Sequence, residues 1–421
     1  MTSQRGGAAW RVPEPQSADV DNVQVRMVVF FTVVNALWAL FHAYLGWRVI
    51  SPLRLTGPPF WYAVGLCVLL ALIVPVGLFG ARFVGQTTTL GHGLNIAGYT
   101  YMGLFMMAFP VFVARDLLYG IGVVGASGLA MVTSRAAEDL LPSPERRAFA
   151  DSMFAAAVGL MTLGAGAYGY RSAMSLPPYK RVTVSYPNLP PGLDGYRIAQ
   201  ISDIHIGAPL TRDQLAAIVQ KTNALGADLI AVTGDLVDGQ IKALKEEVSP
   251  IAELKAEHGV YFVTGNHEYY SGHRAWCDEV SRLGLTVLNN AHRIVERQGA
   301  RLLVAGVTDY TAGQFDPEHA SDPRKALEGA PEHDFRLLLA HQPKTVPAAV
   351  EAGYDLQLSG HTHGGQFFPG PLFIDRFHPI AAGLGTFGRL QVYVSRGTGC
   401  WGPPLRTGAP PEITEITLRR A

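Results

Sequence analysis

Long apolar runs occupy the first 170 residues of the chain, and short apolar runs separated by polar stretches occupy the rest. The long runs cover residues 27–47, 60–79, 96–114, 117–132 and 152–170. A helix of about 20 apolar residues crosses a bilayer core. Arg115 and Asp116 separate the third run from the fourth, which is either a short extra span or a helix at the membrane surface. We therefore expect a transmembrane domain of four or five helices within residues 25–175, after a polar, disordered tail over residues 1–24.

The arginine residues that flank these runs bear on the orientation of the membrane domain. With five spans, most of them lie on the side of the N-terminus. The positive-inside rule would then place the N-terminus in the cytoplasm and the chain after Tyr170 outside it. With four spans the arginines are nearly balanced and do not distinguish the two orientations. We predict an extracytoplasmic C-terminal domain, and a cytoplasmic placement is the alternative.

Residues 180–421 show the pattern of a layered α/β domain. Short apolar runs predict buried strands at residues 196–202, 228–233, 260–264, 302–307, 335–340, 354–358 and 390–395. Longer amphipathic stretches predict helices at residues 210–225, 241–257, 273–283 and 345–352. A domain of this length can fold around one core or one pair of packed sheets.

Five of the predicted strands are followed by polar residues of the kinds that bind metal ions. In chain order these residues are Asp203 and His205, then Asp235, then Asn266, then His341, and finally His361 and His363. The carboxyl ends of strands form the site crevice in layered α/β folds, so we expect these side chains to converge. Residues two apart in extended backbone point the same way. On that argument, one strand end presents His361 and His363 to the same site.

Composition and charge narrow the chemistry of this predicted site. The three cysteines, Cys67, Cys277 and Cys400, are far apart and odd in number, so neither a disulfide framework nor a thiolate metal site is indicated. The formal net charge is zero, so nothing indicates a nucleic-acid partner. Closely packed carboxylates would repel one another, and cations remove that repulsion. Seven ligands suit two ions about 3.5 Å apart that share a carboxylate. Imidazole, carboxylate and amide together favour Mn, Fe or Zn over Ca or Mg.

The ordered motifs Asp-X-His, Gly-Asp, Gly-Asn-His-Glu, His and Gly-His-X-His resemble the calcineurin-like metallophosphoesterase family over about residues 182–418. The stretches 364–366 and 394–397 are similar to a bacterial membrane-attached branch that resembles enzymes cleaving UDP-2,3-diacylglucosamine. The resemblance implies a four-layer αββα sandwich, in which two packed mixed sheets are flanked by helices. It also implies an integral protein of a bacterial inner or plasma membrane.

The resemblance implies a role for each motif residue. One divalent ion would be bound by Asp203, His205, Asp235 and His363, and a second by Asp235, Asn266, His341 and His361. His267 would face the phosphate and act on the leaving group, and Asp238 would either orient His267 or cap the following helix. Arg396 is a weaker candidate for substrate binding, with a surface role as its alternative.

We expect a membrane-anchored phosphoesterase that cleaves a phosphodiester or pyrophosphate bond by attack of a hydroxide that bridges the two metals. The membrane domain favours a lipid-linked or envelope substrate, and a cytoplasmic site would favour a lipid A precursor. The alternative is a catalytically silent membrane sensor or scaffold that uses a metallophosphoesterase-like domain. The complete ligand set favours the enzyme.

Overall fold

The computed structural model describes residues 17–85, 88–133, 136, 140–207 and 209–421, and the chain divides into two compact units at residue 71. The first unit contains helix α1 (Ser17–Ile50) and the first half of α2 (Pro58–Val84). The two helices pack closely, since the Trp38 indole N–H donates a hydrogen bond of 2.9 Å to the carbonyl of Ala71. Helix α1 includes residues 17–24, which were predicted to belong to the polar tail, and residues 1–16 lie outside the described residues.

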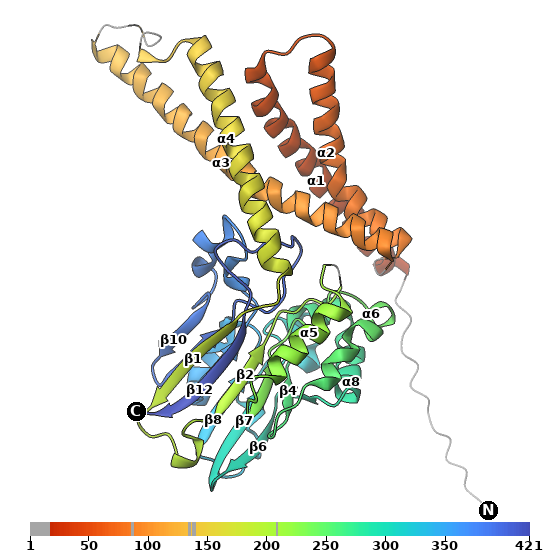
Figure 1. The fold of residues 1–421 in the computed structure, drawn as a ribbon, viewed down its shortest axis with the longest axis vertical. Coiled ribbons are helices and arrows are strands. Elements are labelled where there is room, and N and C mark those ends of the chain that lie inside the picture. The colour runs from red at the N-terminus through yellow and green to blue at the C-terminus, as the bar shows by residue number, and fades with distance from the viewer. Residues whose placement is uncertain (1–16, 86–87, 134–135, 137–139, 208) are drawn as a thin grey trace, which may run out of the picture. The chain divides into compact units, whose positions relative to one another are not determined.

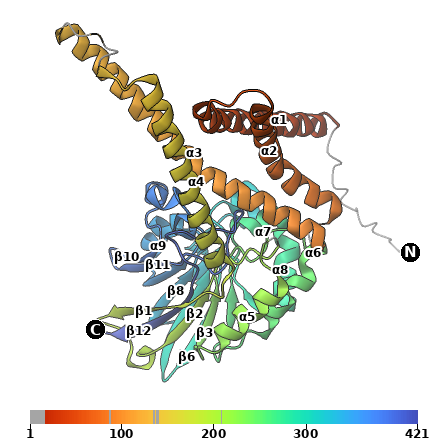
Figure 2. The ribbon, with the colours of Figure 1, turned by 45° about the horizontal axis from the view of Figure 1, so that its top comes forward.

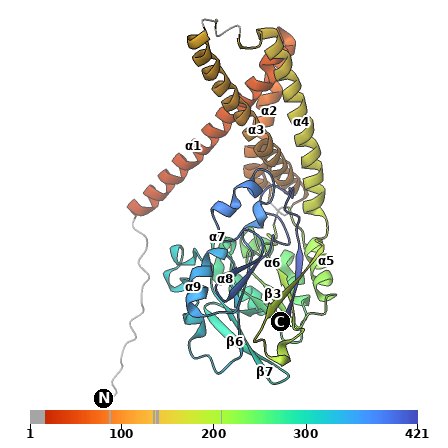
Figure 3. The ribbon, with the colours of Figure 1, turned by 90° about the vertical axis from the view of Figure 1, so that its left-hand side faces the viewer.

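The second unit contains helices α3 (Thr89–Thr133) and α4 (Pro144–Met174), which lie side by side over part of their length (Figure 3). The third and fourth apolar runs of the sequence form one continuous helix, α3. Arg115, in the middle of α3, pairs with Asp116 and with Asp151 of α4, so its charge is compensated locally. The described residues thus include four helices that are long and apolar enough to cross a membrane.

Two six-stranded mixed sheets follow α4 (Figure 1). The first has the order β1-β12-β2-β3-β4-β5, with strands Tyr179–Tyr186, Ile413–Arg420, Arg197–Ile201, Leu229–Val232, Val260–Phe262 and Thr286–Val287. The second has the order β10-β11-β9-β8-β7-β6, with strands Gly383–Phe387, Leu390–Val394, Leu356–Ser359, Phe335–Leu339, Ala300–Gly306 and Ala291–Arg297. Strands β2 to β5 are parallel, as are β11, β9, β8 and β7.

The apolar side chains form three layers of core around these sheets. Ile198, Leu229, Leu337 and Leu356 belong to the core between the sheets. Helices α5 (Arg212–Asn223), α6 (Ile241–Val248) and α8 (His273–Arg282) cover the outer face of the first sheet. Helix α9 (Val346–Ala352) covers the second sheet beside β8 and β11 (Figure 2). The predicted four-layer αββα sandwich is confirmed.

All seven predicted strands are present, and the four predicted helices begin within two residues of their expected starts. The helix predicted for residues 241–257 is shorter, because Pro250 has no amide hydrogen to continue it. Strands β1, β5, β6, β10 and β12 were not predicted, nor was the short helix α7 (Asn266–Ser271). The carboxyl ends of β2, β3, β4, β8 and β9 carry the candidate ligands.

Candidate metal centre

The candidate ligands share an unusual backbone conformation. Asp203, His205, Asp235, His361 and His363 have φ angles of 54°, 55°, 52°, 71° and 51°. Non-glycine residues rarely adopt this left-handed region, and residues that do so cluster at functional sites. The conformation corrects the expectation that the last strand end is extended. The chain turns sharply after β9, and His361 and His363 contact different groups of side chains as a result.

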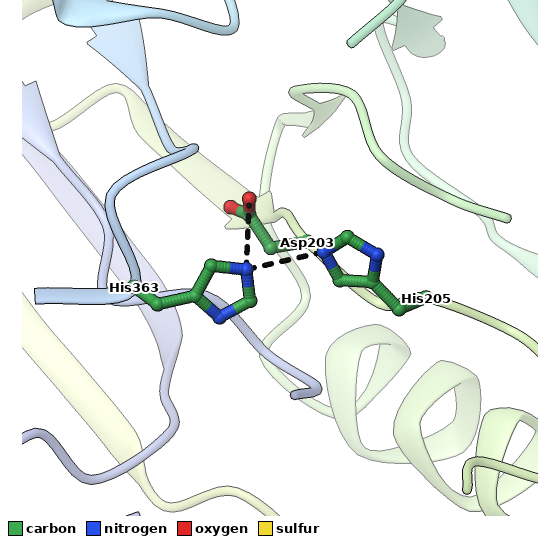
Figure 4. A group of neighbouring side chains, drawn as sticks. All are labelled: Asp203, His205 and His363. Carbon is green, nitrogen blue, oxygen red and sulfur yellow. Dashed lines mark hydrogen bonds and ion pairs between the residues drawn. The ribbon is translucent and has the colours of Figure 1, made fainter. Parts of the chain in front are cut away.

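The first group contains Asp203, His205 and His363 (Figure 4). Nε2 of His363 lies 3.1 Å from Nε2 of His205 and 3.5 Å from Oδ1 of Asp203. Both oxygens of Asp203 accept hydrogen bonds from the backbone N–H of His361, at 2.9 and 3.1 Å. Three side chains from two separate loops thus direct potential ligand atoms to one point.

The second group contains Asp235, His341 and His361. Nε2 of His341 lies 3.1 Å from Oδ2 of Asp235. The same carboxylate oxygen is 3.8 Å from Nε2 of His205, which belongs to the first group. Asn266 begins α7 and is buried, and the next residue, His267, donates its backbone N–H to Oδ1 of Asp235 at 2.8 Å. Asp235 therefore lies between the two groups, the position of a carboxylate that two ions share.

Asp238 holds two of the imidazoles in place. One of its carboxylate oxygens lies 2.9 Å from Nδ1 of His205 and 2.5 Å from Nδ1 of His267. With Nδ1 so bound, each ring directs Nε2 toward the site, and Nε2 of His267 is 4.0 Å from Oδ2 of Asp235. Helix α6 begins after Gln240, and Asp238 does not cap it. Asp238 thus contacts both imidazoles and makes no capping bond to α6, and its role in orienting His267 stays a prediction.

The site disfavours charge on two of its histidines. Burial lowers the pKa of His361 to about 3, and the charge of nearby His341 acts in the same direction. Burial and the Arg406 guanidinium hold the pKa of His363 well below its usual value. Both imidazoles are therefore neutral near pH 7, which is the form that binds metal ions.

Asp235 and His341 behave differently because they face each other. Burial alone would raise the pKa of Asp235, but the charges of His341, His267 and His205 outweigh it and keep that pKa well below the usual value. Burial would lower the pKa of His341, but Asp235 outweighs it and raises that pKa well above the usual value. A cation bound between Asp235 and Nε2 of His341 would replace the proton on that nitrogen.

A buried ligand-type atom supports metal binding. Oδ1 of Asn266 is buried without a hydrogen-bond partner among the described residues, and the buried Nε2 of His341 faces the Asp235 carboxylate at 3.1 Å. A buried polar atom without a partner costs about 1–3 kcal/mol, which a bound cation would offset. With the imidazole and carboxylate atoms around them, these residues fit two divalent cations.

Close approach of the loops depends on two glycines. A Cβ atom added at Gly265 would lie 2.1 Å from Oδ1 of Asp235, and one at Gly360 would lie 2.2 Å from Oδ2 of Asp203. Both separations are far below van der Waals contact, so each glycine lets a neighbouring loop approach a candidate ligand.

Several residues around the site were not predicted to be functional. The buried Glu268 carboxylate accepts backbone N–H bonds from Gly265, Asp235 and Leu236 at 2.6, 3.0 and 2.8 Å, which joins two loops that carry candidate ligands. The rings of Tyr270 and Trp401 flank His267, at centroid distances of 5.1 and 5.9 Å. The sequence gives no signal that Tyr270 and Trp401 lie beside His267, because an aromatic residue in a polar loop has no pattern that indicates its neighbours.

Arg406 is buried and lies against the first group. Its guanidinium donates to the carbonyls of His363, Arg396 and Gly399, and Nη2 is 2.9 Å from Nδ1 of His363. Burial lowers the Arg406 pKa to about 10. Arg396 itself pairs with Glu412 at 3.3 Å, so its charge is already compensated.

A third cluster of His273, Asp316 and His319 lies apart from the predicted ligands. Arg274 approaches Oδ2 of Asp316 at 2.6 Å, and His273 approaches the same oxygen at 3.1 Å. The guanidinium already compensates this carboxylate, so we interpret the cluster as an ion-pair network.

Comparison with known proteins identifies the family. The profile of the calcineurin-like phosphoesterase family matches residues 196–365. A zebrafish (Danio rerio) "Transmembrane protein with metallophosphoesterase domain" is 32% identical over 407 residues, which cover 94% of this chain and 90% of that protein. The chain belongs to the calcineurin-like phosphoesterase family. The match to the zebrafish protein includes the helical part, so this metallophosphoesterase shares both regions with that relative.

Bacterial relatives of this metallophosphoesterase are also present. A Helicobacter pylori protein named "Uncharacterized metallophosphoesterase" is 36% identical over 282 residues, 66% of this chain and 74% of that protein. The Bacillus subtilis "Uncharacterized metallophosphoesterase YkuE" is 32% identical over 287 residues, 65% of this chain and 97% of that protein. The predicted family is confirmed. The narrower similarity to enzymes that cleave UDP-2,3-diacylglucosamine stays a prediction.

Proposed function

We propose that this metallophosphoesterase hydrolyses a phosphodiester or pyrophosphate bond of a lipid-linked or cell-envelope substrate. The observation that carries the proposal is the pair of candidate ligand groups with Asp235 between them. One cation would be held by Asp203, His205, Asp235 and His363, and the other by Asp235, Asn266, His341 and His361. The mixture of nitrogen and oxygen donors favours Mn, Fe or Zn.

The cations would supply Lewis acidity, which withdraws charge from the phosphoryl oxygens and makes hydroxide available near neutral pH. The protein's own residues supply orientation and proton transfer. Asp238 fixes the rings of His205 and His267 through their Nδ1 atoms. This directs Nε2 of His267 into the site, where it can donate a proton to the leaving oxygen. His267 is then a catalytic residue and Asp238 a positioning residue.

The substrate class is inferred from the helices that precede the catalytic domain. Four described helices are long and apolar enough to cross a membrane, which keeps the site near a lipid surface. We propose an integral protein of a bacterial inner or plasma membrane with an extracytoplasmic catalytic domain. If the domain faces the cytoplasm instead, a nucleotide-activated lipid A precursor is the substrate class to test.

The full-length chain in detergent, stripped with a chelator and reloaded with Mn, tests the reaction. We expect turnover of an aryl phosphodiester that requires the added metal. His267→Ala should lower turnover strongly while metal content stays near that of the wild type, since His267 is not assigned as a ligand. His333→Ala, at a half-buried position before the amino end of β8, the end opposite to the one that carries His341, is the matched control.

Two outcomes would contradict parts of this proposal. A folded wild-type protein without turnover under any divalent metal would favour the alternative, a catalytically silent membrane sensor or scaffold. If His267→Ala loses its metal as well as its turnover, His267 is a metal ligand.

A further inference from the structure

Residues 367–377, which we call the apolar loop, expose an unusual number of large apolar side chains. Phe368, Leu372, Phe373 and Phe377 are exposed by 37%, 64%, 47% and 66%. They account for four of the eleven exposed large apolar or aromatic side chains described between residues 179 and 421. Exposed clusters of this kind mark interaction surfaces, because water disfavours them.

Both ends of the apolar loop lie close to the candidate ligand groups. It begins four residues after His363, and His378 follows its last residue. The ring of His378 lies 5.4 Å from that of His361. A partner that binds the apolar loop would therefore lie close to the candidate metal centre.

The base of the apolar loop packs on the apolar helices. Phe367 is buried in a cluster with Met107 of α3 and with Leu405, and Ala165 and Tyr170 of α4 pack against the same cluster. These residues all belong to one compact unit of the chain. The exposed part of the loop thus directly follows a residue that packs against candidate membrane spans.

Hydrogen bonds join Gln366, the residue before the loop, to the segment of residues 401–406, and that segment to α4. The Gln366 amide donates to the carbonyls of Trp401 and Pro403 at 2.8 and 3.0 Å. The backbone N–H of Arg406, in the same segment, donates to the carbonyl of Gly169 in α4 at 2.9 Å. An added Cβ atom at Gly169 would lie 3.3 Å from that nitrogen, so the segment and the helix are in close contact.

These contacts occur at one end of the α4 span. The apolar run of α4 covers residues 152–170 and is followed by Arg171 and, after a short connection, by β1. Residues 165–170 therefore lie where the span meets the head-group layer on the side of the catalytic domain. Tyr170 and the exposed Trp401 are the residue types that favour this layer.

The apolar loop carries two neighbouring exposed charges, Asp375 and Arg376, and the basic one fits a lipid surface. The guanidinium of Arg376 lies 5.4 Å from the ring centre of Phe373. A long basic side chain beside exposed apolar groups can reach lipid phosphates while its neighbours lie deeper.

We propose that the apolar loop inserts into the bilayer, with Leu372, Phe373 and Phe377 among the acyl chains, so that the metal centre opens onto the lipid head groups. The inference rests on the membrane placement in the proposed function, and it narrows the substrate class to phosphoesters that reside in a bilayer.

Fluorescence quenching in vesicles tests the insertion. The full-length chain carries Cys67→Ala, since Cys277 and Cys400 are buried. It also carries either Leu372→Cys or the matched control Val350→Cys, at an exposed position of α9. Each protein is labelled with a pyrene maleimide and reconstituted into vesicles of phosphatidylcholine and phosphatidylglycerol with nitroxide-labelled acyl chains. We expect several-fold stronger quenching at position 372 than at position 350, and Phe377→Cys should repeat the result.

Two outcomes would overturn the proposal. Equal quenching at positions 372 and 350 would place the loop in water. Excimer emission from pyrene at position 372, without quenching by the lipids, would show that a second copy of the chain covers the loop. Because the measurement needs no substrate, it reports insertion whether or not the phosphoesterase reaction occurs.

Discussion

Gly265→Ala isolates how much the metal centre depends on close approach of two loops. Gly265 has φ −100° and ψ −175°, which alanine adopts without strain. The added methyl would lie 2.1 Å from Oδ1 of Asp235, 2.6 Å from its backbone nitrogen and 2.8 Å from its Cγ. Real Cβ atoms essentially never approach closer than 3.0 Å, so the loops must separate by about 0.9 Å.

The expected effects follow from that displacement. Overpacking of this kind lowers the free energy of unfolding by about 1–3 kcal/mol. Replacing glycine with alanine raises it by only about 0.4–1 kcal/mol, because alanine reduces the conformational entropy of the unfolded chain. For a domain of this size, the net loss lowers Tm by a few degrees. A misplacement near 1 Å costs about 100-fold in rate. Because Asp235 is assigned to both cations, the content of both metals should fall together.

The measurements are turnover of an aryl phosphodiester with Mn, metal content, and thermal unfolding of the full-length chain in detergent. The matched control is Gly239→Ala, whose added Cβ would meet only the flexible end of Leu244, at 3.0 Å. We expect that variant to keep its metals and its activity. The reasoning is refuted if Gly265→Ala retains both metals and turns over within a few-fold of the wild type.

Two further predictions concern protonation and topology. Burial alone would lower the pKa of His267, but the bond to Asp238 and the charge of Asp235 raise it from 6.5 to about 9. In the chelated protein, this pair should therefore stabilise the fold fully below pH 6.5, and the stability should be lost as pH rises through about 9. Denaturant titrations across this range should show a smaller loss of unfolding free energy for Asp238→Asn than for the wild type. The exposed control Asp278→Asn should follow the wild type. A loss in Asp238→Asn equal to that of the wild type would contradict the assignment. For topology, a periplasmic reporter fused after Ala421 should be active and a cytoplasmic reporter at the same place inactive, and the reverse result would place the catalytic domain in the cytoplasm.

The buried strands and the ligand residues could be predicted from sequence because their signal is local. An apolar run such as residues 229–232, followed by Gly234 and Asp235, indicates both a strand and a functional loop end. Strand β6 was missed because it reads Ala-His-Arg-Ile-Val-Glu-Arg and lies at the edge of its sheet. Arg293 and Glu296 are exposed, and the pairing with β7 defines the strand.

The surroundings of the ligands could not be predicted, because distant segments create them. Arg406 follows Pro403 and Pro404 in a stretch that is typical of a surface loop. It is buried because carbonyls at residues 363, 396 and 399 converge on its guanidinium. The roles of Trp401 and Tyr270 beside His267 depend on the same tertiary arrangement.

The left-handed backbone at five candidate ligands has a consequence for how this chain can change over generations. Glycine would relax the backbone at each of these positions, because it has no Cβ to strain there. A chain that needed only its shape would therefore gain stability by losing its ligands one at a time. Here Asp203, His205, Asp235, His361 and His363 are all still present. Five side chains at strained positions are expected of a protein that uses them for chemistry, which favours the proposed enzyme over a silent scaffold.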